Sequence, residues 1–136
     1  MNVGVVVVTH GGLGREFLQA LRQIVPDPPE FRFVSIDPDQ SVDEMRSAIA
    51  KELEAADQGK GVLVLTDMFG GTPSNISLSF MKEHRVEVVT GLNLPMLTKL
   101  ATLQEEKPLE ELATFIKSYG QRNISVASGI LLDDEQ

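Results

Sequence analysis

Two polar side chains that follow apolar segments are the residues of this sequence best suited to chemistry. His10 follows the apolar run 3–8 and Asp67 follows the apolar run 62–65, each after one threonine. A carboxylate beside a histidine accepts one ring N–H, fixes the tautomer and leaves the other ring nitrogen as a nucleophile. If the two runs are neighbouring strands, we expect Asp67 to orient His10 for attack on a phosphoryl group.

Glycine-rich loops follow both of these residues. Phosphoryl transfer depends mainly on positioning and on donors for the equatorial oxygens. Glycine permits close backbone approach, and a helix start presents free N–H groups to anions. The predicted phosphate-binding residues are Gly11, Gly12, Thr66, Gly70, Gly71 and Thr72. This arrangement requires no metal and no cofactor.

Each feature also has a purely structural interpretation. A histidine before glycines can be a turn residue, and glycines after parallel strands are common connectors. The two loops together favour a site more strongly than either loop alone. Phe69 either packs inward or, if exposed, contacts a partner protein. His84 lies between two charged residues and is expected at a solvent-facing helix end.

The hydrophobic pattern predicts strands that alternate with helices. Short apolar runs predict strands at 3–8, 31–36, 62–65, 86–90 and 124–127. Helical spacing, the capping box of Ser41 and Glu44, and proline and glycine signals predict the helices. These are expected at 17–25, from 42 to near 59, 73–81 with Thr72 as N-cap, 95–103, and 109–119 closed by Gly120.

This alternation predicts a doubly wound α/β fold. Right-handed crossovers produce a mostly parallel sheet with helices on both faces. In the flavodoxin-like order 2-1-3-4, the first and third strands flank the switch point where ligands collect. His10 and Asp67 would meet there, at the carboxyl edge of the sheet. The run 124–127 would add a final strand, which could be antiparallel to the others.

Composition restricts the classes of function. The 136 residues suit one domain, 1–136, and the net charge of −8 disfavours nucleic acid or an anionic membrane and favours a basic partner. Cysteine is absent and the two histidines are too few for a typical zinc site. We find no signal peptide and no apolar run of membrane-spanning length, so we expect a cytoplasmic protein without direct membrane insertion.

Other functional classes receive less support. The sequence contains no Walker motif, no complete dinucleotide-binding glycine fingerprint and no Gly-x-Ser-x-Gly elbow. A receiver-like module phosphorylated on Asp67 is an alternative, but receivers carry an acidic pair where Thr9 and His10 stand. A non-catalytic binding module is a further alternative.

Three segments carry a resemblance to a known family. The sequence at 9–11, at 66–75 (Thr-Asp-Met-Phe-Gly-Gly-Thr-Pro-Ser-Asn) and at 91–97 resembles the mannose-family enzyme IIA of the bacterial sugar phosphotransferase system. The resemblance covers nearly the whole chain in order and spacing. It implies a phosphotransferase in which His10 accepts phosphate from phosphorylated HPr and passes it to an enzyme IIB, for sugar uptake.

The resemblance also implies roles for neighbouring residues and an oligomeric state. Asp67 would bind His10, with Gly70, Gly71 and Thr72 near the phosphoryl oxygens. Relatives form homodimers that exchange the C-terminal strand, which corresponds to 124–127 here.

The sequence departs from some relatives at two positions. Met68 replaces a small hydroxyl residue and Gly12 replaces a bulkier residue. The chain shows no enzyme IIB domain, so we expect it to act on a separate polypeptide. A regulatory phosphoprotein of the same family, without transport, is the alternative.

Overall fold

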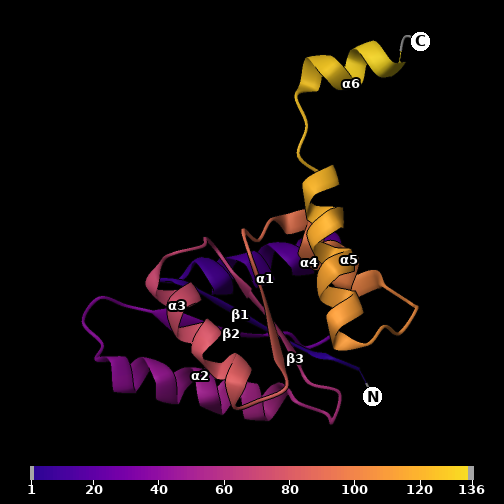
Figure 1. Ribbon diagram of the computed structural model, residues 1–136. Coiled ribbons are helices and arrows are strands. Elements are labelled where there is room, and N and C mark those ends of the chain that lie inside the picture. Colours follow the sequence, from indigo (N-terminus) through magenta and orange to yellow (C-terminus); the bar gives the residue numbers. More distant parts are fainter. Residues whose placement is uncertain (1, 135–136) are drawn as a thin grey trace.

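Strands and helices alternate along the computed structural model, which describes residues 2–134 (Figure 1). The strands are β1 (Gly4–His10), β2 (Arg32–Ile36), β3 (Val62–Thr66) and β4 (Val86–Thr90). The helices are α1 (Leu13–Ile24), α2 (Val42–Ala56), α3 (Thr72–Ser79), the short 3-10 helix η1 (Phe80–Lys82), α4 (Leu94–Thr102), α5 (Leu109–Arg122) and α6 (Ala127–Asp134). Within 2–134, no helix combines the length and apolar character needed to cross a bilayer.

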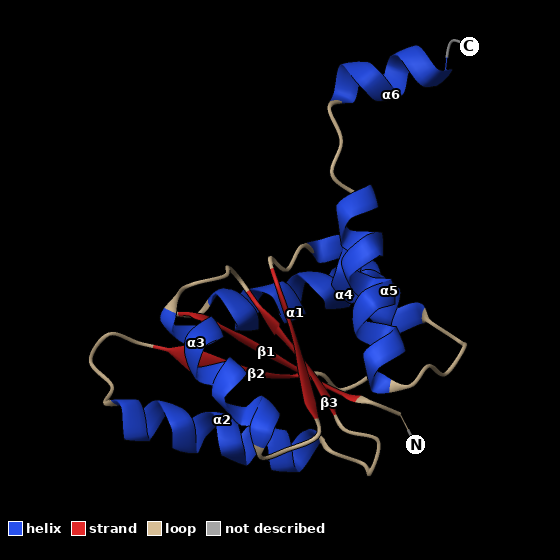
Figure 2. Cartoon of the chain, viewed as in Figure 1, coloured by secondary structure: helices blue, strands red, loops and turns tan. Residues whose placement is uncertain are grey.

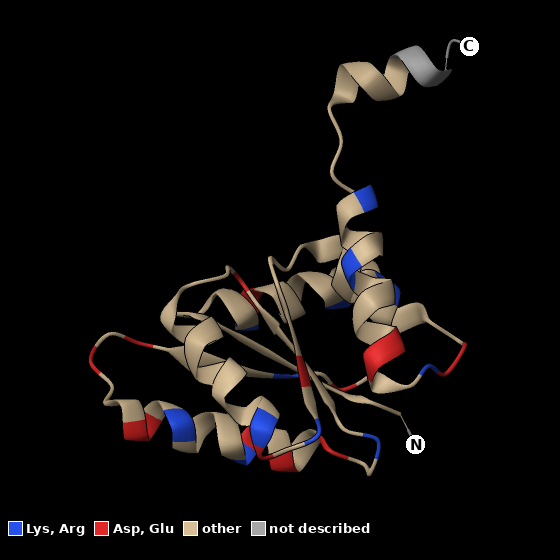
Figure 3. Cartoon of the chain, viewed as in Figure 1, with Lys and Arg blue, Asp and Glu red and all other residues tan. Residues whose placement is uncertain are grey.

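The four strands form one parallel sheet in the order β2-β1-β3-β4, which confirms the predicted fold class. Helices cover both faces of this sheet (Figure 2). Charged residues lie mainly on the helices and loops (Figure 3). Because helices cover both faces, the central strands β1 and β3 bury apolar side chains on both sides, as the valine run of β1 predicted.

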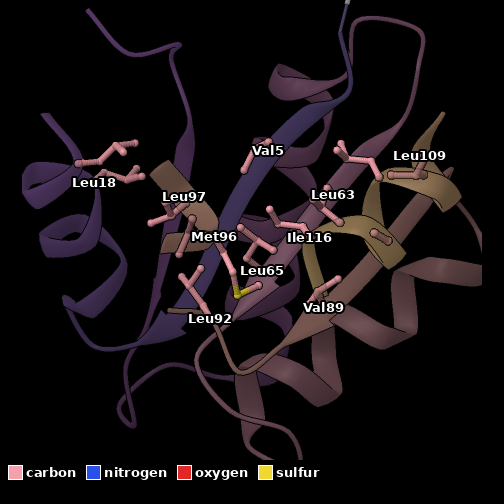
Figure 4. Packing of buried hydrophobic residues seen from close by; sticks show 14 of the residues in the cluster. Val5, Leu18, Leu63, Leu65, Val89, Leu92, Met96, Leu97, Leu109 and Ile116 are labelled. Atoms are coloured by element: carbon pink, nitrogen blue, oxygen red, sulfur yellow. The ribbon is translucent and has the colours of Figure 1, made fainter. Parts of the chain in front are cut away.

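Successive residues of each central strand enter two separate cores. Val7, Leu63 and Leu65 pack beneath α1, α4 and α5, where Figure 4 shows Met96 and Ile116 among them. Val8 and the other residues of alternate parity pack on the opposite face against α2 and α3. Because both cores pack on β1 and β3, the carboxyl ends of these two strands are held in a fixed position relative to each other.

Two predicted helix boundaries are wrong. Gly71, and not Thr72, is the N-cap of α3, and no side chain caps this helix. Gly120 does not close α5, which continues to Arg122. Gly120 is buried within α5, and a Cβ there would lie 2.6 Å from Sδ of Met96 on α4. This glycine therefore permits close packing of the two helices and does not end the helix.

Within the single chain, the predicted strand at 124–127 is absent. Residues 124–126 connect α5 to α6, and α6 extends away from the sheet (Figure 1). A strand needs a neighbour for its backbone groups, whereas a helix satisfies most of them internally. The end of α5 carries this segment beyond the sheet, which leaves Ile124 and Val126 each 74% exposed.

Candidate functional site

The side chains of His10 and Asp67 are in direct contact at the carboxyl edge of the sheet. Nδ1 of His10 lies 2.8 Å from Oδ2 of Asp67, and the backbone N–H of His10 donates to the same oxygen at 3.0 Å. An ionised carboxylate only accepts hydrogen bonds, so the ring proton belongs on Nδ1 and Nε2 keeps its lone pair. The predicted contact between these two residues is confirmed.

Strand pairing brings the two residues together. β1 and β3 are parallel neighbours, and Val8 pairs with Thr66. Both strands therefore end at nearly the same level of the sheet edge. His10 is the last residue of β1 and Asp67 follows the last residue of β3. The contact spans 57 residues of sequence and therefore depends on the sheet and not on local structure.

Asp67 is held on both of its oxygens. Oδ2 accepts from His10, and Oδ1 accepts from the backbone N–H of Met68 at 3.0 Å. Partial burial of the carboxyl opposes its ionisation, but the hydrogen bonds from the His10 ring and backbone, together with the charge of His10, outweigh this effect. The pKa of Asp67 therefore lies below its usual value.

The loop after β3 touches the face of the His10 ring. A Cβ on Gly71 would lie 2.8 Å from Cε1 and 3.2 Å from Nε2 of His10. Any larger residue would press on the ring and cover its second nitrogen. Gly70, the preceding residue, has a φ of +85°, a backbone conformation that residues with a side chain rarely adopt. These two glycines keep Nε2 accessible beside the start of α3.

The remaining predicted phosphate-binding residues occupy different depths. Thr72 is exposed in the first turn of α3, where backbone N–H groups lack intrahelical acceptors. Gly11 and Gly12 form the turn between His10 and α1, with φ of +50° at Gly11. Thr66 differs from these residues. It is fully buried, and its hydroxyl has no partner within 2–134, so the structure does not bring Thr66 to the surface of the site.

Two residues near the site were missed by sequence reasoning. Thr9 is buried, and its hydroxyl accepts the backbone N–H of Gly14 at 2.7 Å, which ties the start of α1 to the end of β1. A threonine that ends an apolar run was the available signal. A guanidinium nitrogen of Arg15 (Nη2) lies 3.8 Å from the position that a Cβ on Gly12 would take. Arg15 was not among the residues that the sequence predicted for the site.

Exposed apolar side chains flank the site. Phe69 is 73% exposed and Met68 is 56% exposed, so the inward-packed interpretation of Phe69 is wrong. The loop from β2 to α2, which carries Asp37 and Asp39, leaves the same edge of the sheet (Figure 3). His84 lies just after η1 and is exposed, as predicted.

Comparison with known proteins identifies the family. A family model described as EIIA-man, PTS system fructose IIA component, matches residues 4–117. The chain belongs to this family. Membership gives the enzyme IIA domain a phosphotransfer role in the sugar phosphotransferase system, as the sequence motifs predicted. The match includes both strand ends and both glycine loops.

Individual relatives support the same placement. The mannose-specific EIIAB component of Escherichia coli strain K12 is 26% identical over 127 residues, which span 91% of this chain but only 39% of that relative. The fructose-specific EIIA component of Bacillus subtilis strain 168 is also 26% identical, over 93% of this chain and 87% of its own length. The chain is thus similar to only part of the first relative and to most of the second.

A solved structure shows the same fold. The mannose/sorbose specific IIA subunit from Enterococcus faecalis superposes with a TM-score of 0.84 and 29% identity, covering 93% of this chain and 95% of that one. The parallel sheet and its helices are therefore shared with an enzyme IIA subunit over nearly the full length of both chains.

The lowered pKa of Asp67 predicts a pH-dependent contribution to stability. A carboxyl whose folded-state pKa lies below its unfolded value stabilises the fold above about pH 4 and loses this contribution as the pH falls through the folded-state value. We expect the difference in unfolding free energy between the wild type and Asp67→Asn to shrink between pH 5 and pH 2.5, roughly the range in which this carboxyl protonates. Denaturant titrations at both pH values measure it.

The same substitution at the exposed Asp39 is the matched control for removing a carboxylate from the surface. A difference between wild type and Asp67→Asn that stays constant across this pH range would contradict the assigned charge interaction.

Proposed function

We propose that this chain is a phosphocarrier of the sugar phosphotransferase system that accepts a phosphoryl group on Nε2 of His10 and passes it to an enzyme IIB. The donor in this proposal is phosphorylated HPr. The observation that carries the proposal is the 2.8 Å contact between Nδ1 of His10 and Asp67. It leaves Nε2 as the nucleophilic nitrogen at the open side of the ring.

The proposed transfer is balanced without a cofactor. The Nε2 lone pair forms a bond to phosphorus while the bond between phosphorus and the donor nitrogen breaks, and that electron pair returns to the donor histidine. His10 keeps its proton on Nδ1. The ring consequently gains positive charge, which the Asp67 carboxylate stabilises. Transfer to enzyme IIB repeats these steps in the opposite direction, with a histidine as acceptor.

The glycine loops are proposed to hold the phosphoryl oxygens. Gly70 and Gly71 permit close backbone approach at Nε2, and Thr72 offers a hydroxyl and the N–H groups of the first turn of α3. Gly11 and Gly12 form the turn that follows His10. We place Thr66 outside this set because its side chain is fully buried.

The protein partners are proposed to dock around His10. Phe69 and Met68 supply an exposed apolar contact, and the acidic loop after β2 supplies negative charge at the same edge of the sheet. An interface of this kind fits a partner with an apolar centre and a basic rim. The same face would serve HPr and enzyme IIB in turn, since both must reach one nitrogen atom.

An acyl phosphate on Asp67 is less well supported. Both oxygens of this carboxylate accept hydrogen bonds, and neither is poised as a nucleophile. The receiver-like alternative also disagrees with membership in the enzyme IIA family.

Phosphorylation of His10 can be measured with two matched histidine variants. Phosphorylated HPr is expected to label the wild type and His84→Ala but not His10→Ala, and the product should be labile in acid and stable in base. Asp67→Asn should slow labelling by about 10- to 100-fold, because a charge-assisted hydrogen bond contributes about 1.5–3 kcal/mol. Rapid-quench labelling measures both effects.

Equal labelling of His10→Ala and wild type would contradict the proposal. Onward transfer is then followed with a purified enzyme IIB of the family as acceptor. Retention of the label on His10 in its presence would favour the regulatory alternative over transport.

We also propose that the chain forms homodimers through the segment 124–126. β4 is an edge strand, and a cavity of about 460 Å³ beside it is lined by residues of β4, α4 and α5, including Val88, Met96 and Ala113. The exposed Ile124 and Val126 of a second copy would supply the apolar side chains and the missing strand neighbour.

Substitution of both residues tests this dimer. We expect light scattering to give the mass of two chains for the wild type and of one chain for Ile124→Asp/Val126→Asp, because buried charge opposes association. Ile24→Asp, at an exposed position at the end of α1, is the control and should remain dimeric. A wild type with the mass of one chain at micromolar concentration would contradict the proposal.

A further inference from the structure

A second cavity, of about 760 Å³, opens at the amino-terminal edge of the sheet. Its walls come from the start of β1, the segment before β2, the loop before β3 and the connection between α4 and α5. Apolar side chains form part of these walls, among them Val3, Leu103 and Leu112. The volume is within the range of small-molecule sites.

Most charged residues that line this cavity are already paired. Arg32 contacts Glu30 at 3.4 Å and also binds Glu52, and Lys107 contacts Glu105 at 3.7 Å. Glu106 is engaged as well. Lys107 also contacts Glu111 at 3.7 Å, so Arg32 and Lys107 each contact two carboxylates and neither is available to an anionic ligand.

Lys60 and Arg85 are the exception. Both line the cavity and are exposed, and neither forms an ion pair with another residue of 2–134. The backbone segments that carry them meet, because the N–H of Val62 donates to the backbone carbonyl of Arg85 at 3.0 Å. These two cations are therefore the charged groups of this cavity that are available to an anionic ligand.

Gly61 allows this arrangement. Its φ is +85°, and a Cβ there would lie 2.8 Å from the carbonyl oxygen and 3.0 Å from Cγ of Arg85. A larger residue would therefore displace Arg85 from the entrance to β3. The two cations are positioned by the same backbone contacts that start β3 and β4.

We infer that this cavity binds a small phosphorylated sugar, with Lys60 and Arg85 on the phosphate. Guanidinium and ammonium groups are the side chains that bind phosphate best. The amides of Gln58 and Gln104, which also line the cavity, suit sugar hydroxyls, and the apolar wall suits the C–H face of the ring. The choice of a sugar phosphate over other small phosphates rests on the proposed function, whose transport reaction generates phosphorylated sugars.

This site is separate from His10. The seven residues of β1 run from the cavity at Gly4 to His10, so the two sites lie about 20 Å apart at roughly 3.3 Å per residue. A bound sugar phosphate would therefore not occupy the phosphoryl-transfer site. The protein could therefore bind a sugar phosphate, the kind of product that the proposed transport reaction forms, while His10 stays accessible to its partners.

Titration calorimetry of the full chain tests the inference with fructose 6-phosphate, fructose and inorganic phosphate as separate probes. We expect saturable binding of fructose 6-phosphate, with both of the other probes at least about tenfold weaker, because each lacks one half of the contacts. Lys60→Gln/Arg85→Gln should weaken the binding by at least about tenfold, since it removes two charge-assisted contacts. Lys51→Gln/Lys82→Gln, which removes two exposed cations outside the cavity, is the matched control and should bind like the wild type.

His10→Ala keeps this test independent of the proposed phosphotransfer, because it should bind fructose 6-phosphate like the wild type. Lys60→Gln/Arg85→Gln should conversely keep normal labelling of His10. Absence of saturable binding to the wild type, equal binding of inorganic phosphate, or equal weakening in the control variant would each overturn the inference.

Discussion

The hydrogen bond between His10 and Asp67 is the interaction on which the rest of the site depends. It fixes the ring orientation and its tautomer, and it determines which nitrogen can act as a nucleophile. No local turn could form it, because the two residues are 57 positions apart. The bond exists because β1 and β3 are adjacent, parallel and in a register that ends both at one level. The two cores that clamp these strands therefore also hold the site in place.

In the proposed function, the same edge of the sheet must stay open to large partners. Glycine is required where the loop after β3 crosses the His10 ring, since a Cβ on Gly71 would lie 2.8 Å from Cε1. The apolar side chains of Met68 and Phe69, in the same loop, are exposed to solvent. A phosphocarrier needs this combination, because its nucleophile has to be rigidly oriented and yet reachable by two proteins in succession.

Sequence periodicity and strand-end chemistry were sufficient to predict the sheet, its strand order and the contact of His10 with Asp67. Valine runs buried on both faces are specific to parallel sheets, and the switch-point rule then places the strand ends together. Details set by tertiary packing were not predictable. Gly120 resembles a helix terminator but permits close contact with Met96, and Thr66 resembles a surface hydroxyl but is fully buried. The segment 124–127 has strand-forming residues, yet in a single chain it has no strand to pair with.

The cavity at the opposite edge was invisible in the sequence for a similar reason. Lys60 and Arg85 are 25 positions apart and carry no motif, and only the start of β3 beside β4 brings them together. The carboxyl edge and the amino edge of this parallel sheet thus have different properties. The carboxyl edge holds the histidine and glycine loops, and the amino edge holds the uncommitted cations.

The position of the phosphoryl group on the His10 ring tests the central claim most directly. It can be read from the nitrogen chemical shifts and phosphorus couplings of the protein labelled with ¹⁵N-histidine and phosphorylated by HPr. Because Asp67 occupies Nδ1, the account predicts a single phosphohistidine substituted at Nε2. Phosphorylation at Nδ1 of His10, or on the carboxylate of Asp67, would contradict it.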